Sequence, residues 1–261
     1  MENTKKKVNK KPMLIAGIAM LLALVGCVGG LTYSKYVSSK SIPSTQATVA
    51  KWGYVITANS TNLFGTKYVK GDADNTAKVA SEGTGVIVSA STNNVIAPGA
   101  TGSLTLSVKG TAEVAAKLNI ALTVTSDITL KDGTEESANV YSPVKWTLTN
   151  NGTAIVSDVT LAEVAKKINQ TDVTIDANAT SIDYDYELTY SWPFDGSKTN
   201  TDLKANASDT TGITADTADT ILGLKAAGTT LTDTDYAYAQ DWDASTTLSL
   251  SLTASVEQVI A

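Results

Sequence analysis

The chain has 261 residues, a formal net charge of −6, one cysteine and no histidine. A chain without histidine cannot hold Ser–His or Cys–His nucleophile pairs or imidazole metal ligands, and the acidic balance disfavours nucleic acid as a partner. Because 43% of the residues are hydrophobic and the chain is rich in sheet-favouring threonine, valine and tyrosine, the composition predicts a folded, all-β protein that is not an enzyme.

The first 31 residues are organised as an export signal. Five lysines precede Met13, and residues 13–31 are almost wholly apolar or glycine. This apolar run is nearly long enough to span a bilayer, but its glycines disfavour a stable helix. We therefore predict a signal peptide at residues 1–33 and a secreted, extracellular mature protein.

Two routes of signal removal remain open. Residues 24–27 (LVGC) match the lipobox of bacterial lipoproteins, in which Cys27 becomes the lipidated N-terminus and holds the protein on the membrane. The other route is cleavage slightly later by a signal peptidase, after which only the uncleaved precursor would touch the membrane. The cleavage region of this second route comprises Gly29, Gly30, Leu31, Thr32, Tyr33 and Ser34.

Three segments near this region carry a resemblance to a known family. Residues 29–33 (GGLTY) form a glycine-rich processing segment, residues 33–37 (YSKYV) an aromatic-rich start, and residues 46–52 (QATVAKW) a first strand. In these features, and in a Pro-Gly turn at 98–99 and an Asp-Thr-x-Leu-Gly element at 219–223, the chain resembles the TasA/camelysin family of Gram-positive bacteria. The resemblance implies processing by a SipW-type signal peptidase and a jelly roll with added helices. The casein cleavage described for camelysins is not carried over, because the chain has no His-Glu-x-x-His motif.

The resemblance also implies a structural function. In the TasA family the mature N-terminus is a donor strand that completes the sandwich of the next subunit, so that subunits assemble head to tail into biofilm-matrix fibres. The corresponding donor here is residues 34–44, with Tyr36, Val37 and Ile42 as its apolar plugs. The expected partners are further copies of the chain and the signal peptidase, with a minor fibre or anchoring protein as a further candidate.

Residues 45–261 read as one β domain of about eight to ten strands, because apolar residues alternate with polar ones in many short segments. The first strand is expected at Thr48–Ala58, and a short strand near Lys67–Val69 lies between polar loops. Further strands are expected at 86–88, 104–108, 118–124, 140–148, 154–156, 183–192 and 248–256.

One short helix is expected among the strands. Thr160 and Glu163 have the spacing of a capping box, and Leu161, Val164 and Ile168 then follow at helical spacing. A second, single helical turn is expected at residues 221–224. With these helices, the strands predict a jelly-roll-like two-sheet β-sandwich.

The strand at 183–192 places tyrosines and Trp192 on one face, and such a row either binds sugars by stacking or fills the core. In a chain with only two phenylalanines, we favour the interpretation that these aromatic residues fill the core.

The alternative function is a surface lipoprotein, anchored at Cys27, that binds a ligand or carbohydrate through this face or through loops at 195–235. No cofactor is expected. Four pairs of aspartates at alternate positions could each offer two oxygen ligands to Ca²⁺: Asp72/Asp74, Asp183/Asp185, Asp233/Asp235 and Asp241/Asp243. In a chain this acidic, such pairs are expected by chance.

Overall fold

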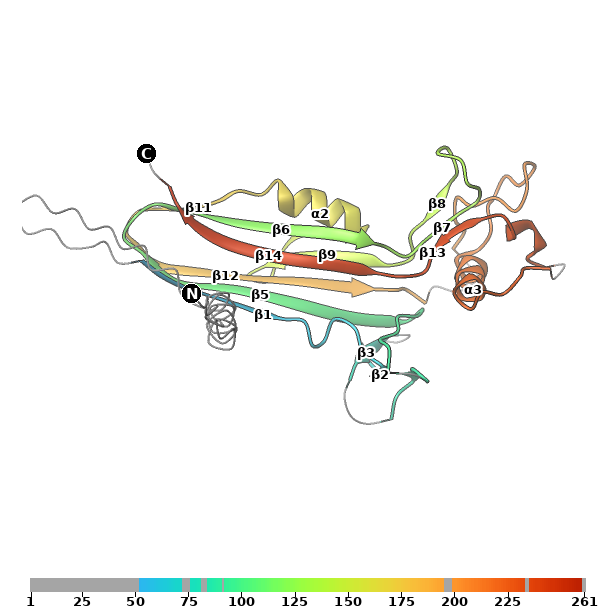
Figure 1. Ribbon diagram of the computed structural model, residues 1–261, viewed down its shortest axis with the longest axis horizontal. Helices are drawn as coiled ribbons and strands as arrows, with labels where there is room; N and C mark the ends of the chain where they lie inside the picture. Colours follow the sequence, from blue (N-terminus) through green and yellow to red (C-terminus); the bar gives the residue numbers. More distant parts are fainter. Residues whose placement is uncertain are drawn as a thin grey trace, which may run out of the picture. The chain divides into compact units, whose positions relative to one another are not determined.

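A computed structural model describes residues 52–71, 76–80, 84–90, 92–194, 199–232 and 235–259. These residues form two packed sheets, a third sheet of three short strands and two α-helices, so the predicted all-β sandwich is confirmed (Figure 1). None of the helices within the described ranges is long and apolar enough to cross a bilayer. The predicted signal peptide and the candidate donor at 34–44 lie outside the described residues.

The larger sheet is built from long antiparallel strands whose residues alternate between the core and the outer surface. Val108, Leu188 and Trp146 point into the core and are almost completely buried, whereas the residues between them are mostly Ser, Thr or charged. This is the pattern expected of a sheet that has one face against a core and one face in water. From one edge to the other, its long strands are β10 (Thr153–Val159), β9 (Lys145–Asn150), β12 (Ala179–Ser191), β5 (Ala100–Ala112) and β1 (Trp52–Asn59).

The smaller sheet has only two long strands, β6 (Ala116–Ser126) and β14 (Ser249–Gln258). They pair along their whole length, from Gln258 opposite Ala116 to Ser249 opposite Ser126. On the other side of β6, the short strand β11 (Val173–Ile175) pairs only with residues 116–118.

Helix α2 (Leu161–Asn169) closes one side of the sandwich. Thr160 caps it, and the predicted capping box with Glu163 is present in full. Leu161, Val164 and Ile168 are buried, as predicted, and the helix packs on β6 and also contacts β9 and β10. Because α2 connects β10 of the larger sheet to β11 of the smaller one, it covers the gap between the two sheets on that side.

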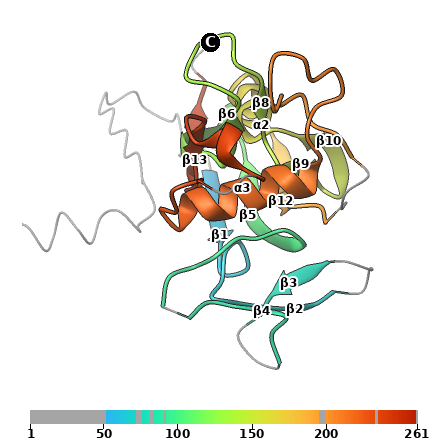
Figure 2. The same cartoon turned by 90° about the vertical axis from the view of Figure 1, so that its right-hand side faces the viewer.

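Two smaller parts extend the sandwich (Figure 2). Strands β2 (Lys67–Lys70), β3 (Ala77–Val79) and β4 (Ile87–Val88) form a flap, which joins the larger sheet where β3 runs parallel to the start of β5. Helix α3 (Ala215–Ala226) lies at one end, where the Trp192 indole and the Tyr141 hydroxyl donate hydrogen bonds to Asp219 at 3.1 and 3.0 Å. Beside α3 are β7 (Thr129–Lys131), β8 (Val140–Tyr141), β13 (Asp243–Ser245) and a 3₁₀ turn (Ala237–Ala239).

Two sequence predictions were wrong in extent. The single strand expected at 140–148 is broken into β8 and β9 by Ser142-Pro143, since proline has no N–H to donate to a ladder, and β8 joins a different sheet. The single turn expected at 221–224 is the second half of α3. Its first half was missed because alanines, Ala215 and Ala218, supply the buried side chains there in place of large apolar residues.

The aromatic row of β12 belongs to the core, as favoured. Tyr186, Tyr190 and Trp192 are 4%, 2% and 6% exposed, so they do not form an open platform for sugars. The Tyr190 hydroxyl lies 3.0 Å from that of Tyr68, and its ring lies 5.4 Å from the ring of Trp146. Burial is the main reason that the pKa of Tyr190 is raised.

Candidate assembly interface

The side of the sandwich opposite α2 is bordered by two edge strands, β1 and β14. Among the described strands, β1 pairs only with β5, and β14 pairs only with β6. The two edge strands belong to different sheets but lie close together. The Tyr54 hydroxyl on β1 donates a hydrogen bond to the carbonyl of Val256 on β14 at 3.4 Å. We call the space bordered by β1 and β14 the seam.

The two layers of the sandwich differ in width. At about 4.8 Å per strand, the long strands of the larger sheet are about 24 Å wide. The smaller layer consists of β6, β14 and α2, which together are about 20 Å wide if the helix contributes about 10 Å. The smaller layer is therefore narrower by about one strand, and the shortfall lies at the seam because α2 covers the other side.

Burial at the seam agrees with this shortfall. On β14, the inward-facing Leu250 and Leu252 are only half-buried, whereas Leu122, opposite Leu252 on β6, is 2% exposed. On β1, the inward-facing Ile56 is half-buried, whereas Val108, opposite it on β5, is completely buried. Apolar side chains along both borders of the seam thus retain surface that one more strand would cover.

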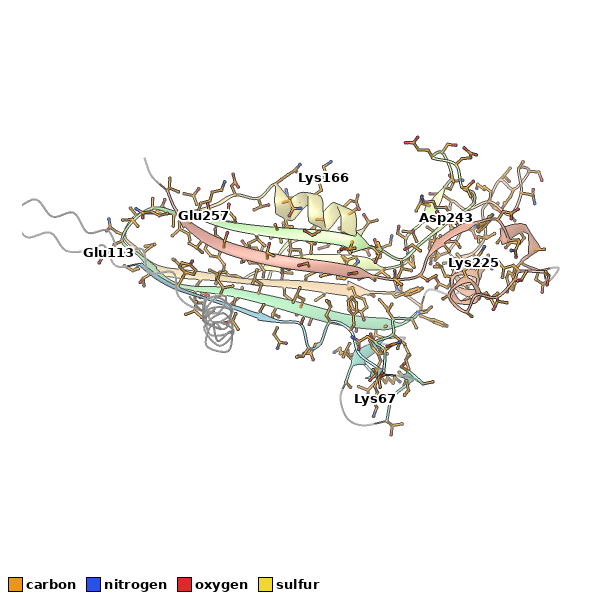
Figure 3. The ribbon with its side chains drawn as sticks, in the orientation of Figure 1. Lys67, Glu113, Lys166, Lys225, Asp243 and Glu257 are labelled. Atoms are coloured by element: carbon orange, nitrogen blue, oxygen red, sulfur yellow. The ribbon has the colours of Figure 1, made fainter. Side chains whose placement is uncertain are left out.

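The seam has two different ends. At one end, Trp52 pairs with Ala112, and the N–H of Val259 donates to the carbonyl of Ala115, so the domain's first and last described residues both meet the β5–β6 turn. Figure 3 shows Glu113 and Glu257 at this end, and Lys225 and Asp243 at the opposite end. Between the segments that follow β1 and precede β14 there is a cavity of about 330 Å³, lined by Phe64, Asn94, Val95, Ile96, Thr246, Thr247 and Leu248.

The chemistry that this arrangement offers is that of strand pairing. A β-strand edge presents backbone N–H and C=O groups, and apolar side chains beside it provide pockets for alternate residues of an added strand. The sequence predicted the strand at 248–256, but nothing in the spacing of its apolar residues distinguishes an edge strand from a central one.

The acidic pair Asp183/Asp185 binds a lysine within the protein. On the outer face of the larger sheet, Lys109 Nζ lies 2.6 Å from Asp183 Oδ1 and 2.9 Å from Asp185 Oδ2. These hydrogen bonds raise the pKa of Lys109, while hydrogen bonds from Ser107 and then Lys109 lower that of Asp185.

Several predicted site residues lie outside the described part of the chain. They are Cys27, the cleavage residues Gly29 to Ser34, the donor plugs Tyr36, Val37 and Ile42, the pair Asp72/Asp74, and Asp233.

Comparison with known proteins gives little further guidance. The chain matches no family model and no curated protein. Among solved structures it is similar to the ASH/PapD-like domain of human CEP192 (PapD-like domain 7), at 13% identity over 62% of this chain and 73% of that chain, with a TM-score of 0.18. A similarity this low carries no argument about function.

Proposed function

We propose that this protein is a secreted structural subunit of an extracellular, biofilm-matrix fibre, assembling head to tail by donor-strand complementation. The seam is the observation that carries the proposal. A strand from a second copy, laid between β1 and β14, would pair with backbone groups of these edge strands and cover the half-buried Ile56, Leu250 and Leu252.

The length of the candidate donor supports this assignment. Residues 34–44 would span about 36 Å when extended, and the 10 residues of β14 span about 33 Å. Tyr36, Val37 and Ile42 are the apolar side chains that the donor brings to the seam. Removal of residues 1–33 would free this segment, so export would act as the assembly switch.

The polarity of the domain supports an open filament. The donor precedes Trp52 in the chain, and Trp52 lies at the β5–β6 end of the seam. The cavity lined by Phe64 lies at the opposite end, between the segments that follow β1 and precede β14. An interface between a segment of one copy and a different surface of the next is heterologous, and such contacts produce filaments unless the rotation closes a ring.

Two substitutions on neighbouring residues of β14 test the proposal. In protein beginning at Ser34, Leu252→Lys would bury an ammonium group in the seam, at a cost of several kcal/mol, and should leave the protein monomeric. The matched control Thr253→Lys changes an exposed residue that faces away from the core and should still form filaments. Electron microscopy and light scattering distinguish these outcomes, and filaments formed equally by both variants would reject the seam as the acceptor.

A second experiment addresses the donor and the alternative lipoprotein function together. Mass spectrometry of the exported protein should find a free N-terminus between Tyr33 and Lys40, whereas a lipidated Cys27 would favour a membrane-held binding module. Deletion of residues 34–44 should abolish filaments, and a synthetic peptide of the same residues should then bind the truncated monomer. Unchanged filaments after the deletion would refute the donor role.

A further inference from the structure

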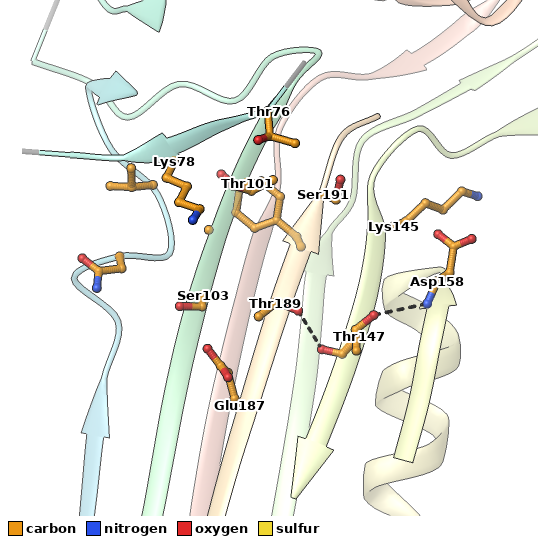
Figure 4. Close-up of a pocket in the computed structure, with 14 residues that line it drawn as sticks. Thr76, Lys78, Thr101, Ser103, Lys145, Thr147, Asp158, Glu187, Thr189 and Ser191 are labelled. Carbon is orange, nitrogen blue, oxygen red and sulfur yellow. Dashed lines mark hydrogen bonds between the residues drawn. The ribbon is translucent and has the colours of Figure 1, made fainter. Parts of the chain in front are cut away.

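A second concave surface lies on the outer face of the larger sheet, away from the sandwich interior (Figure 4). It is an open groove of about 630 Å³, within the usual size range of small-molecule sites. Its floor carries hydroxyl side chains from three adjacent strands: Thr101 and Ser103 of β5, Thr189 and Ser191 of β12, and Thr147 of β9.

Strand register arranges these side chains in two rows that cross the strands. In the first row Thr101, Ser191 and Lys145 are direct neighbours. The second row consists of Ser103, Thr189 and Thr147. Neighbouring side chains in a row are separated by the strand spacing of about 4.8 Å, which is comparable with the length of one sugar residue in an extended chain.

Asn62, in the segment before the flap, lines the groove on its flap side. This segment lies against β5 at Gly102, and the N–H of Ser103 donates to the carbonyl of Asn62 at 2.9 Å. A Cβ on Gly102 would collide with the carbonyl oxygens of Asn62 and Leu63. The lining side chain of Lys78, on β3, stands on this side (Figure 4).

The opposite side depends on an irregular strand. Asp158 of β10 has a φ of +57°, in the left-handed region, and lies within the register shift between Val156 and Val159 that disrupts pairing with β9. Its N–H donates to the Thr147 hydroxyl at 3.3 Å, and its carboxylate lines the groove near Lys145 (Figure 4). Residues other than glycine rarely adopt this backbone conformation, and residues in such conformations cluster at binding sites.

The charges in the groove balance. Lys78 and Lys145 contribute two ammonium groups, and Asp158 and Glu187 contribute two carboxylates, in a chain whose overall charge is −6. An anion or a cation would therefore meet like charges as well as opposite ones. A neutral ligand whose hydroxyls both donate and accept hydrogen bonds would find partners in the hydroxyl side chains of the floor and in the lining side chains of Lys145, Asp158 and Glu187.

From this geometry we propose that the groove binds a neutral oligosaccharide or polysaccharide chain laid across β5, β12 and β9. The site is separate from the seam, so this inference stands whether or not the protein forms fibres. In a fibre, each subunit would then also bind a neutral polysaccharide chain on the outer face of its larger sheet.

The test uses the Leu252→Lys protein lacking residues 1–33, together with wild-type mature protein. Cellohexaose, maltohexaose and the fully N-acetylated chitohexaose, all neutral, are titrated separately, and binding is followed by the amide chemical shifts of the protein. At least one neutral hexasaccharide should shift the signals of residues around Ser103 and Thr189 and bind in the millimolar range or more tightly. If none binds below about 10 mM, or if only charged oligomers such as hexalysine or hexagalacturonate bind, the proposal is wrong.

A variant pair separates the groove from unspecific sugar binding. The double substitution Ser103→Ala/Thr189→Val removes two hydroxyls but keeps the strands, and it should weaken binding by about tenfold or more. The control, Thr123→Val, removes an exposed hydroxyl from the outer face of β6 and should leave the affinity unchanged. Equal affinities in all three proteins, each shown by circular dichroism to be folded, would overturn the proposal.

Discussion

Asn169, the last residue of α2, takes the place of a strand beside β6. Its Oδ1 accepts a hydrogen bond from the N–H of Leu122 at 2.8 Å, and its Nδ2 donates to the carbonyl of the same residue at 3.1 Å. Strand β11 pairs with β6 only as far as Leu118, so the side-chain amide satisfies backbone groups further along the same edge. We predict that Asn169→Ala destabilises the domain.

The magnitude follows from two opposing terms. Two lost hydrogen bonds cost about 1 kcal/mol each, and water can reach this partly exposed site, so no larger penalty for buried unpaired groups is added. Alanine is a better helix former than asparagine by about 0.5 kcal/mol. The net expected loss in free energy of unfolding is about 1.5 kcal/mol.

Urea unfolding followed by tryptophan fluorescence measures this change, provided that the slope of the transition is unchanged. The control is Lys166→Ala, an exposed position on the same helix, which should change stability by less than about 0.5 kcal/mol. If Asn169→Ala is as stable as wild type or more stable, the amide does not protect the β6 edge, and the reasoning fails.

Four further predictions concern the two residues of the helix cap, a partly buried acid and a close approach of two backbone segments. Thr160→Ala should cost about 1 kcal/mol in urea unfolding. The hydrogen bond from the Thr160 N–H lowers the pKa of Glu163. The destabilisation caused by Glu163→Ala should therefore be present at pH 7 and disappear as the pH falls through that pKa. A difference in stability between variant and wild type that does not change with pH would contradict this. Burial raises the pKa of Asp127, so Asp127→Asn should raise the melting temperature at pH 7. This gain should vanish below pH about 3.9, where the carboxyl is protonated in the unfolded chain as well as in the folded protein. A lower melting temperature of the variant at pH 7 would refute this prediction. Gly102→Val should lower the melting temperature by several degrees, because its side chain would displace the carbonyl of Leu63; an unchanged value would show that the segment moves aside freely.

The sequence predicted most of the long strands because a strand's alternation of apolar and polar residues is a local property. Residues 118–124, which lie within β6, and residues 183–191, which lie within β12, carry it clearly. The cap of α2 was equally visible, since Thr160 and Glu163 satisfy each other within one turn. The short strands β3, β7, β11 and β13 were not predicted, because three residues are too few to show a period.

The amino-acid sequence by itself determined that the protein is a β-rich domain with one well-capped helix, because alternation and capping depend on neighbouring residues. Only the tertiary structure decided which strands are edges and where the groove lies. Leu122 and Leu252 look alike in the sequence, yet one is buried and the other borders the seam. The reason is that strand pairing joins residues more than a hundred positions apart, as when Leu252 pairs with Leu122, and no local pattern records which neighbours a strand acquires.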